Sequence, residues 1–126
     1  MRKVLLVDDD LNFLEDTESV LRESGYHVFT CDKPIESISA IRKYGPDCVL
    51  LDLRMPVFDG KALLPWLRRQ YPDLAIVICT GIADCSKSYF LQWGVQHFLQ
   101  KPFNLESLIH VIETAITDPV PKLKAA

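Results

Sequence analysis

Short apolar runs and longer amphipathic segments alternate along the chain. The apolar runs are bounded by turn-forming residues, which is typical of strands covered on both faces of a parallel sheet. The runs are Val4–Val7, His27–Cys31, Asp47–Asp52, Leu74–Cys79 and His97–Gln100. Each is followed by a segment whose apolar residues recur at helical spacing. The pattern therefore predicts five successive strand–helix units.

The expected helices begin and end at residues that favour helix termini. Gly25, Gly45 and Gly94 stand where helices should stop, and Asn104 is a good N-cap for the last one. The helices are expected over Leu11–Ser24 and Pro34–Tyr44, after Asp59–Gly60, before Gly94 and after Asn104. Their expected core-facing residues are Phe13, Thr17, Val20 and Leu21, then Ile35, Ile38 and Ile41, then Leu63, Leu64 and Leu67, and finally Leu105, Leu108, Ile109, Ile112 and Ile116.

The alternation of strands and helices predicts the fold class. Right-handed crossovers between successive parallel strands place helices on both faces of one sheet. We expect a flavodoxin-like, doubly wound α/β fold with five strands in the order 2-1-3-4-5 and five helices. That order is taken by analogy from known sheets of this type.

Size and composition favour one folded domain. The chain has 126 residues, of which 48% are hydrophobic, enough for one substantial core. The stretch Asp118–Ala126 contains two prolines and cannot continue a helix. We expect a domain over residues 1–118 and a tail or linker over residues 119–126.

The charge and the remaining composition exclude several classes of partner. A net charge of −3 argues against direct nucleic-acid binding, which needs a basic surface. No apolar segment is long enough to span a membrane, and the start Met1–Val4 leads into a run too short for a signal peptide. A cytoplasmic protein is expected. The cysteine spacing fits no metal or redox motif, so buried structural thiols are expected, with Cys85 the possible exception.

Polar side chains follow four of the five expected strands. Asp8 and Asp9 follow the first, Asp52 ends the third, Thr80 follows the fourth and Lys101 follows the fifth. Ligands gather beyond the carboxyl ends of strands in such sheets, so these residues should converge. Clustered carboxylates favour a divalent cation such as Mg²⁺, while a lysine and a hydroxyl favour an anion. Together they describe phosphoryl transfer to an aspartate.

Each of these residues also has a purely structural interpretation. Asp8, Asp9 and Asp10 could be a helix cap and first-turn acids, Thr80 a turn residue and Lys101 a solvated charge. Their joint occurrence at adjoining strand ends makes coincidence improbable.

Four motifs carry a resemblance to a known family. They are Asp8-Asp9, Asp52-Leu53-Arg54-Met55-Pro56 with Asp59-Gly60, Thr80-Gly81, and Lys101-Pro102-Phe103. In this order they resemble the receiver domain of bacterial two-component response regulators, and the resemblance covers Lys3 to about Thr117.

The resemblance implies a role for each motif. Asp52 would accept a phosphoryl group from a sensor histidine kinase or a histidine phosphotransfer protein. Asp8, Asp9, Asp52 and the backbone carbonyl of Arg54 would hold Mg²⁺ or Mn²⁺. Thr80 and Lys101 would contact phosphoryl oxygens, and a cis peptide bond before Pro102 would aim Lys101 at the site.

The resemblance also implies a switch and an output face. Thr80 and Phe98 would relay phosphorylation to a surface formed by the helix before Gly94, the strand His97–Gln100 and the last helix. Ordinary core packing is the alternative for Phe98. An output domain, a target protein or a second copy of the chain would bind this surface, on or near which lie Tyr89, Phe90, Trp93 and His110.

Two further positions would tune the lifetime of the phosphate. In the family, the residues corresponding to Arg54 and Ile82 flank the water that attacks the aspartyl phosphate, so bulk there would slow its hydrolysis. The expected protein is a signalling switch and not an enzyme in the usual sense. The alternatives are an unphosphorylated interaction module of the same fold and a small phosphatase with an aspartate nucleophile.

Overall fold

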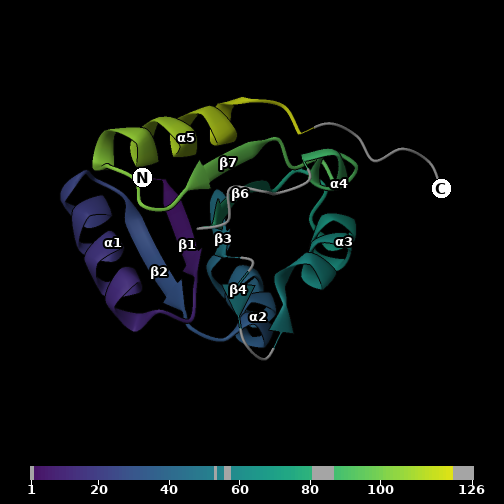
Figure 1. Ribbon diagram of the computed structural model, residues 1–126, viewed down its shortest axis with the longest axis horizontal. Coiled ribbons are helices and arrows are strands. Elements are labelled where there is room, and N and C mark those ends of the chain that lie inside the picture. Colours follow the sequence, from purple (N-terminus) through teal and green to yellow (C-terminus); the bar gives the residue numbers. More distant parts are fainter. Residues whose placement is uncertain (1, 53, 56–57, 81–86, 121–126) are drawn as a thin grey trace.

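Neighbouring strands of the main sheet are all parallel. The computed structural model describes residues 2–52, 54–55, 58–80 and 87–120, and for residues 54–55, 58–61, 80 and 87–88 it describes the backbone alone. The sheet has the order β2-β1-β3-β6-β7 (Figure 1). Its strands are β1 (Lys3–Val7), β2 (His27–Cys31), β3 (Cys48–Asp52), β6 (Ala75–Thr80) and β7 (His97–Gln100). This is the expected order 2-1-3-4-5, so the flavodoxin-like, doubly wound fold is confirmed.

A short antiparallel pair was not predicted. Strands β4 (Arg54–Met55) and β5 (Phe58–Asp59) pair with each other between β3 and the third helix. The pair follows the carboxyl end of β3, whose last residue is Asp52.

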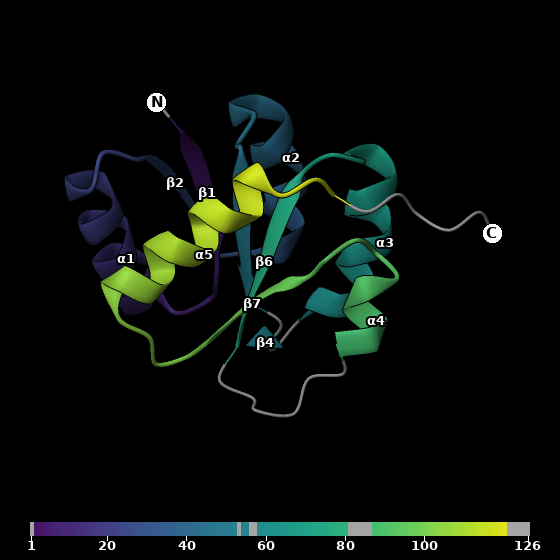
Figure 2. The ribbon, with the colours of Figure 1, turned by 90° about the horizontal axis from the view of Figure 1, so that it is seen from above.

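Helices cover both faces of the sheet. They are α1 (Leu11–Glu23), α2 (Pro34–Tyr44), α3 (Gly60–Gln70), α4 (Lys87–Leu91) and α5 (Leu105–Thr117). Buried side chains of α1 and α5 pack on one face, and those of α2, α3 and α4 pack on the other (Figure 2). Because both faces are covered, the central strands β1, β3 and β6 are apolar over most of their length.

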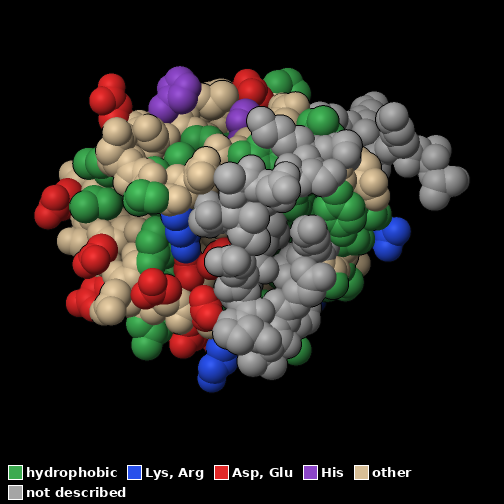
Figure 3. All heavy atoms as spheres, in the orientation of Figure 1, with side chains coloured by type: hydrophobic (Ala, Val, Ile, Leu, Met, Phe, Trp, Pro, Cys, Tyr) green, Lys and Arg blue, Asp and Glu red, His purple; other side chains and the backbone are tan. Residues whose placement is uncertain are grey.

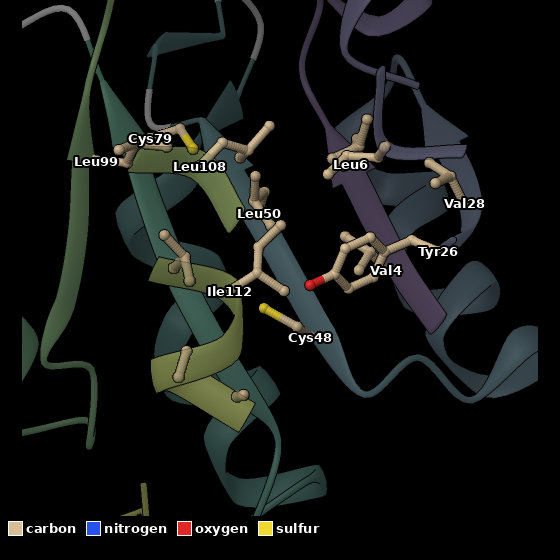
Figure 4. Close-up of a cluster of buried hydrophobic side chains, with 14 of the residues drawn as sticks. Val4, Leu6, Tyr26, Val28, Cys48, Leu50, Cys79, Leu99, Leu108 and Ile112 are labelled. Atoms are coloured by element: carbon tan, nitrogen blue, oxygen red, sulfur yellow. The ribbon is translucent and has the colours of Figure 1, made fainter. Parts of the chain in front are cut away.

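Successive residues of each strand enter different cores. In β1, Val4 belongs to the core under α1 and α5, whereas Leu5 belongs to the core under α2, α3 and α4. Figure 4 shows Ile112 of α5 beside Leu50 of β3 in the first of these cores. Ile112 is 0% exposed, and burying a side chain of this size contributes about 1.5–3 kcal/mol.

The helix termini follow the chemistry that the sequence suggested. The Asn104 side chain accepts a hydrogen bond from the Ser107 amide at 2.8 Å, as an N-cap should. Gly45 ends α2 at φ 59°, a left-handed conformation that favours glycine. Cys31, Cys48 and Cys79 are buried free thiols, as expected, whereas Cys85 lies outside the described residues.

Two expected core positions are wrong. Ile35 is 68% exposed and Leu105 is 41% exposed. Both lie in the first turn of their helices, and the buried residues of these helices come later in each helix. Helical spacing identifies the face of a helix but not the turn at which that face becomes covered.

One fully buried cation had no place in the sequence prediction. Arg68 of α3 is 1% exposed and donates hydrogen bonds to backbone carbonyls that precede β6 and β7. Its acceptors are Trp93 O at 2.7 Å, Leu74 O at 2.7 Å, Pro72 O at 3.1 Å, Tyr71 O at 3.2 Å and Gly94 O at 3.4 Å. The guanidinium therefore ties α3 to two turns at the amino ends of these strands.

Candidate functional site

The carboxyl ends of the central strands bring the candidate residues to one edge of the sheet. In the register of β3, Leu51 lies beside Val7 of β1, and Asp52 lies beside Cys79 of β6. Cys79 in turn pairs with Leu99 of β7. The residues that follow these strand ends are therefore delivered to the same region, as the sequence predicted.

Three carboxylates form a cluster at this edge. One oxygen of each of Asp8, Asp9 and Asp52 lies within 4.8 Å of the others. Asp8 is 1% exposed and Asp52 is 6% exposed, whereas Asp9 faces solvent. Carboxylates held so close repel one another, and hard divalent cations prefer such oxygen ligands. The donor set therefore fits Mg²⁺.

Lys101 lies against the same carboxylates. Its Nζ is 2.5 Å from Asp8 Oδ2 and 3.5 Å from Asp52 Oδ2. Figure 3 shows acidic side chains gathered on this face of the molecule with a basic side chain among them. The peptide bond between Lys101 and Pro102 is cis, as the family resemblance implied.

The surroundings of Lys101 favour its charged form. Burial by itself lowers the pKa of Lys101, but the hydrogen bond to Asp8 and the charges of Asp8 and Asp52 outweigh burial and raise it above the usual value. The ammonium therefore remains charged at neutral pH and can pair with an anion.

An aromatic ring completes the environment of Lys101, and the sequence prediction missed this role. The ring centroid of Phe13, in α1, is 3.9 Å from Lys101 Nζ. The spacing of apolar residues predicted only that Phe13 faces the core. No local pattern relates Phe13 to a lysine that follows β7.

The structure leaves several predicted roles to be tested. Thr80 ends β6 and Arg54 begins β4, but for both residues only the backbone is described. Ile82 lies outside the described residues. The hydroxyl contact of Thr80, the carbonyl ligand of Arg54 and the tuning by Arg54 and Ile82 stay predictions.

The expected switch residue packs against an aromatic neighbour. Phe98 of β7 is partly buried, and its ring meets that of Phe90 edge to face at 5.5 Å. Phe90 is 0% exposed and belongs to the core beneath the expected output surface. His110 is exposed, and it lines a pocket of about 280 Å³ together with Phe98.

A family model identifies the chain. The model of the response regulator receiver domain matches residues 4–113. The chain belongs to this family, whose members are signalling domains of two-component systems that generally bind Mg²⁺ at an acidic pocket and work with histidine kinases and output domains.

Individual relatives agree with this assignment. The DNA-binding transcriptional regulator NtrC of Escherichia coli is 32% identical over 115 residues, which are 90% of this chain and 24% of NtrC. The chain thus spans about a quarter of that relative. The structure of chemotaxis protein CheY4 from Vibrio cholerae matches with a TM-score of 0.85 and 29% identity, over 91% of this chain and 98% of CheY4.

A third relative is a receiver domain solved alone. The non-phosphorylated HemR receiver domain from Leptospira biflexa matches with a TM-score of 0.83 and 27% identity, over 96% of this chain and 98% of the HemR domain. Among the described residues of the present chain, no helix is long and apolar enough to cross a membrane.

Proposed function

We propose that this chain is a phosphorylation-dependent switch in which Asp52 accepts a phosphoryl group. The observation that carries the proposal is the position of Asp52, a largely buried carboxylate at a strand end within 4.8 Å of two further carboxylates and 3.5 Å from Lys101 Nζ. The donor would be a phosphohistidine on a sensor kinase or a phosphotransfer protein. Family membership supports both the reaction and the donor.

The reaction needs little beyond positioned charge. A carboxylate oxygen of Asp52 attacks phosphorus, the bond from phosphorus to the histidine nitrogen breaks, and its electron pair stays on the imidazole. Lys101 lies where it can pair with a phosphoryl oxygen, and Thr80 would donate a hydrogen bond to another. Asp8, Asp9, Asp52 and the Arg54 carbonyl would hold Mg²⁺, which would neutralise charge on the transferred group.

The consequence of phosphorylation would be read at the surface of α4, β7 and α5. Thr80 and Phe98 would carry the change, and Arg54 and Ile82 would set the lifetime of the phosphate. An output domain, a target protein or a second copy of the chain would bind there. The proposed division is a receiver domain over residues 1–118 with a tail or linker over residues 119–126.

Intact mass spectrometry tests the proposal. After incubation with acetyl phosphate and Mg²⁺, we expect one labile adduct of about 80 Da on the parent protein. Asp52→Asn and a sample without divalent metal should carry none. Asp10→Asn is a matched control, because asparagine still caps α1, and it should be labelled like the parent protein.

The other outcomes discriminate between the alternatives. No adduct on the parent protein under any condition would favour an unphosphorylated interaction module. Rapid multiple turnover of an aryl phosphate would favour the phosphatase.

A further inference from the structure

Lys101 is held by two chemically different kinds of partner. Carboxylates of Asp8 and Asp52 lie at 2.5 and 3.5 Å from its Nζ, and the centroid of the Phe13 ring lies at 3.9 Å. The carboxylates carry a formal charge, which a metal ion or a phosphoryl group changes. The ring carries only the partial negative charge of its face, which neither of them alters.

Two contacts position Phe13, one at its backbone amide and one at its ring. The Phe13 amide donates to the side chain of Asp10, the N-cap of α1, at 3.1 Å. The ring of Phe103 meets the Phe13 ring edge to face, at 5.8 Å between centroids and 85° between planes. Because Phe103 follows Lys101 by two residues, the same segment supplies both the ammonium and the ring that orients Phe13.

The Phe13 ring borders the groove into which the Lys101 side chain could turn away from the carboxylates. Phe13 and Lys101 both line an open, mostly apolar groove of about 560 Å³ between α1 and the start of α5. An ammonium released by Asp8 could swing toward this groove and its water. A ring face that is already in contact with the ammonium lowers the free energy of the inward position relative to the outward one.

We propose that Phe13 is a positioning residue whose ring holds the Lys101 ammonium beside Asp52 while the charge of the carboxylates changes. The inference rests on the proposed function for its catalytic consequence, but the contact itself can be tested independently. Phe13 contacts the lysine and not the phosphoryl group, so it acts through Lys101.

Graded fluorination of the ring separates electrostatics from packing. Fluorine withdraws charge from the ring face and barely changes the ring's shape. Replacing Phe13 by mono-, di- and trifluorophenylalanine should slow labelling by acetyl phosphate stepwise, by about three- to tenfold at the last step. Phe13→Leu should be at least as slow, and Phe13→Trp should recover most of the rate.

A matched control uses an aromatic residue elsewhere. The Phe29 ring stacks on the Tyr44 ring, with 4.1 Å between the ring centroids. Among the contacts described, no lysine lies over the Phe29 ring. The same fluorinated series at Phe29 should leave the labelling rate unchanged. Equal rates across the Phe13 series, in a protein that is labelled normally, would overturn the inference and leave the proposed function intact.

Nuclear magnetic resonance tests the contact without phosphorylation. Protons above an aromatic ring are shifted upfield, so the ε-methylene of Lys101 should be shifted in the parent protein and in Asp52→Asn, and not in Phe13→Leu. If the parent protein takes no phosphoryl group but the shift is present, the proposed function fails and the contact stands. If the shift is absent from the parent protein, the inference fails.

Discussion

Two basic side chains are withdrawn from solvent at opposite edges of the sheet. Lys101, at the carboxyl edge, is paired with the carboxylates of Asp8 and Asp52. Arg68, at the amino edge, is surrounded by backbone carbonyls. The first set of partners consists of side chains that can exchange Lys101 for another cation. The second consists of main-chain carbonyl oxygens, which carry no formal charge and do not exchange one cation for another.

The electrostatic consequences differ accordingly. The carboxylates raise the pKa of Lys101 in spite of burial, whereas burial lowers the pKa of Arg68 and the charge of Asp73 only partly opposes this. A cation held by exchangeable charges suits a site that changes state. A cation held by the fixed dipoles of backbone carbonyls suits a structural contact, here between α3 and the turns before β6 and β7.

The largest expected effect is on stability at the amino edge. Arg68→Met removes a donor from five backbone carbonyls, of which Tyr71 O still accepts from the Leu74 amide, and should lower the free energy of unfolding by about 3–5 kcal/mol. Urea denaturation measures this loss. The neighbouring Arg69 is exposed and lies over the Trp93 ring at 5.4 Å, so Arg69→Met should cost less than about 1 kcal/mol. Equal losses in the two variants would show that the carbonyl contacts of Arg68 do not stabilise the fold.

The next effect is on chemistry at the carboxyl edge. Lys101→Met removes the cation that we propose pairs with a phosphoryl oxygen and should slow labelling by acetyl phosphate about 100-fold, as measured by intact mass over time. Its free energy of unfolding in Mg²⁺ should stay within about 1 kcal/mol of the parent value, since a cation from solution can neutralise Asp8. Lys33→Met, at an exposed lysine, is the control for the rate. A loss of stability as large as that of Arg68→Met would contradict the distinction between exchangeable and fixed partners.

The smallest effect is the contribution of Lys101 to the alkaline loss of stability, to which Tyr26, Cys48 and Cys79 also contribute because burial raises their pKa values. The pKa of Lys101 is raised in the folded state, so above pH 10.5 the unfolded chain releases this proton first and the free energy of unfolding falls as pH rises. The stabilisation is fully present below the unfolded pKa and is lost through the folded one. Lys101→Met should lack this contribution, which is at most about 1.4 kcal/mol per pH unit, whereas the stability of Lys33→Met, changed at an exposed lysine, should fall in parallel with that of the parent protein. The free energy of unfolding is measured by urea denaturation at several alkaline pH values. If it falls in parallel for all three proteins, Lys101 does not contribute to the alkaline loss of stability.

The sequence predicted more of the strands than of the helix surfaces. A strand buried on both faces is apolar at every position, so Val49, Leu50 and Leu51 reveal their burial without tertiary information. A helix is covered only where the sheet lies beneath it, and helical spacing does not show where that is. Ile35 and Leu105 were therefore expected in the core, although their side chains are exposed. The hairpin of β4 and β5 was missed because its strands have two residues each, too few for a periodic pattern.

The alternation of the main-sheet strands and helices follows from the sequence alone, and so do the residues that meet at the carboxyl edge. Asp8, Asp52 and Lys101 could be assigned to that edge because parallel strands deliver their carboxyl ends to the same place. The surroundings of these residues, in contrast, depend on tertiary packing. The ring of Phe13 over Lys101 and the carbonyls around Arg68 join segments with no local relation in sequence, since such contacts depend on how helices pack against neighbouring turns.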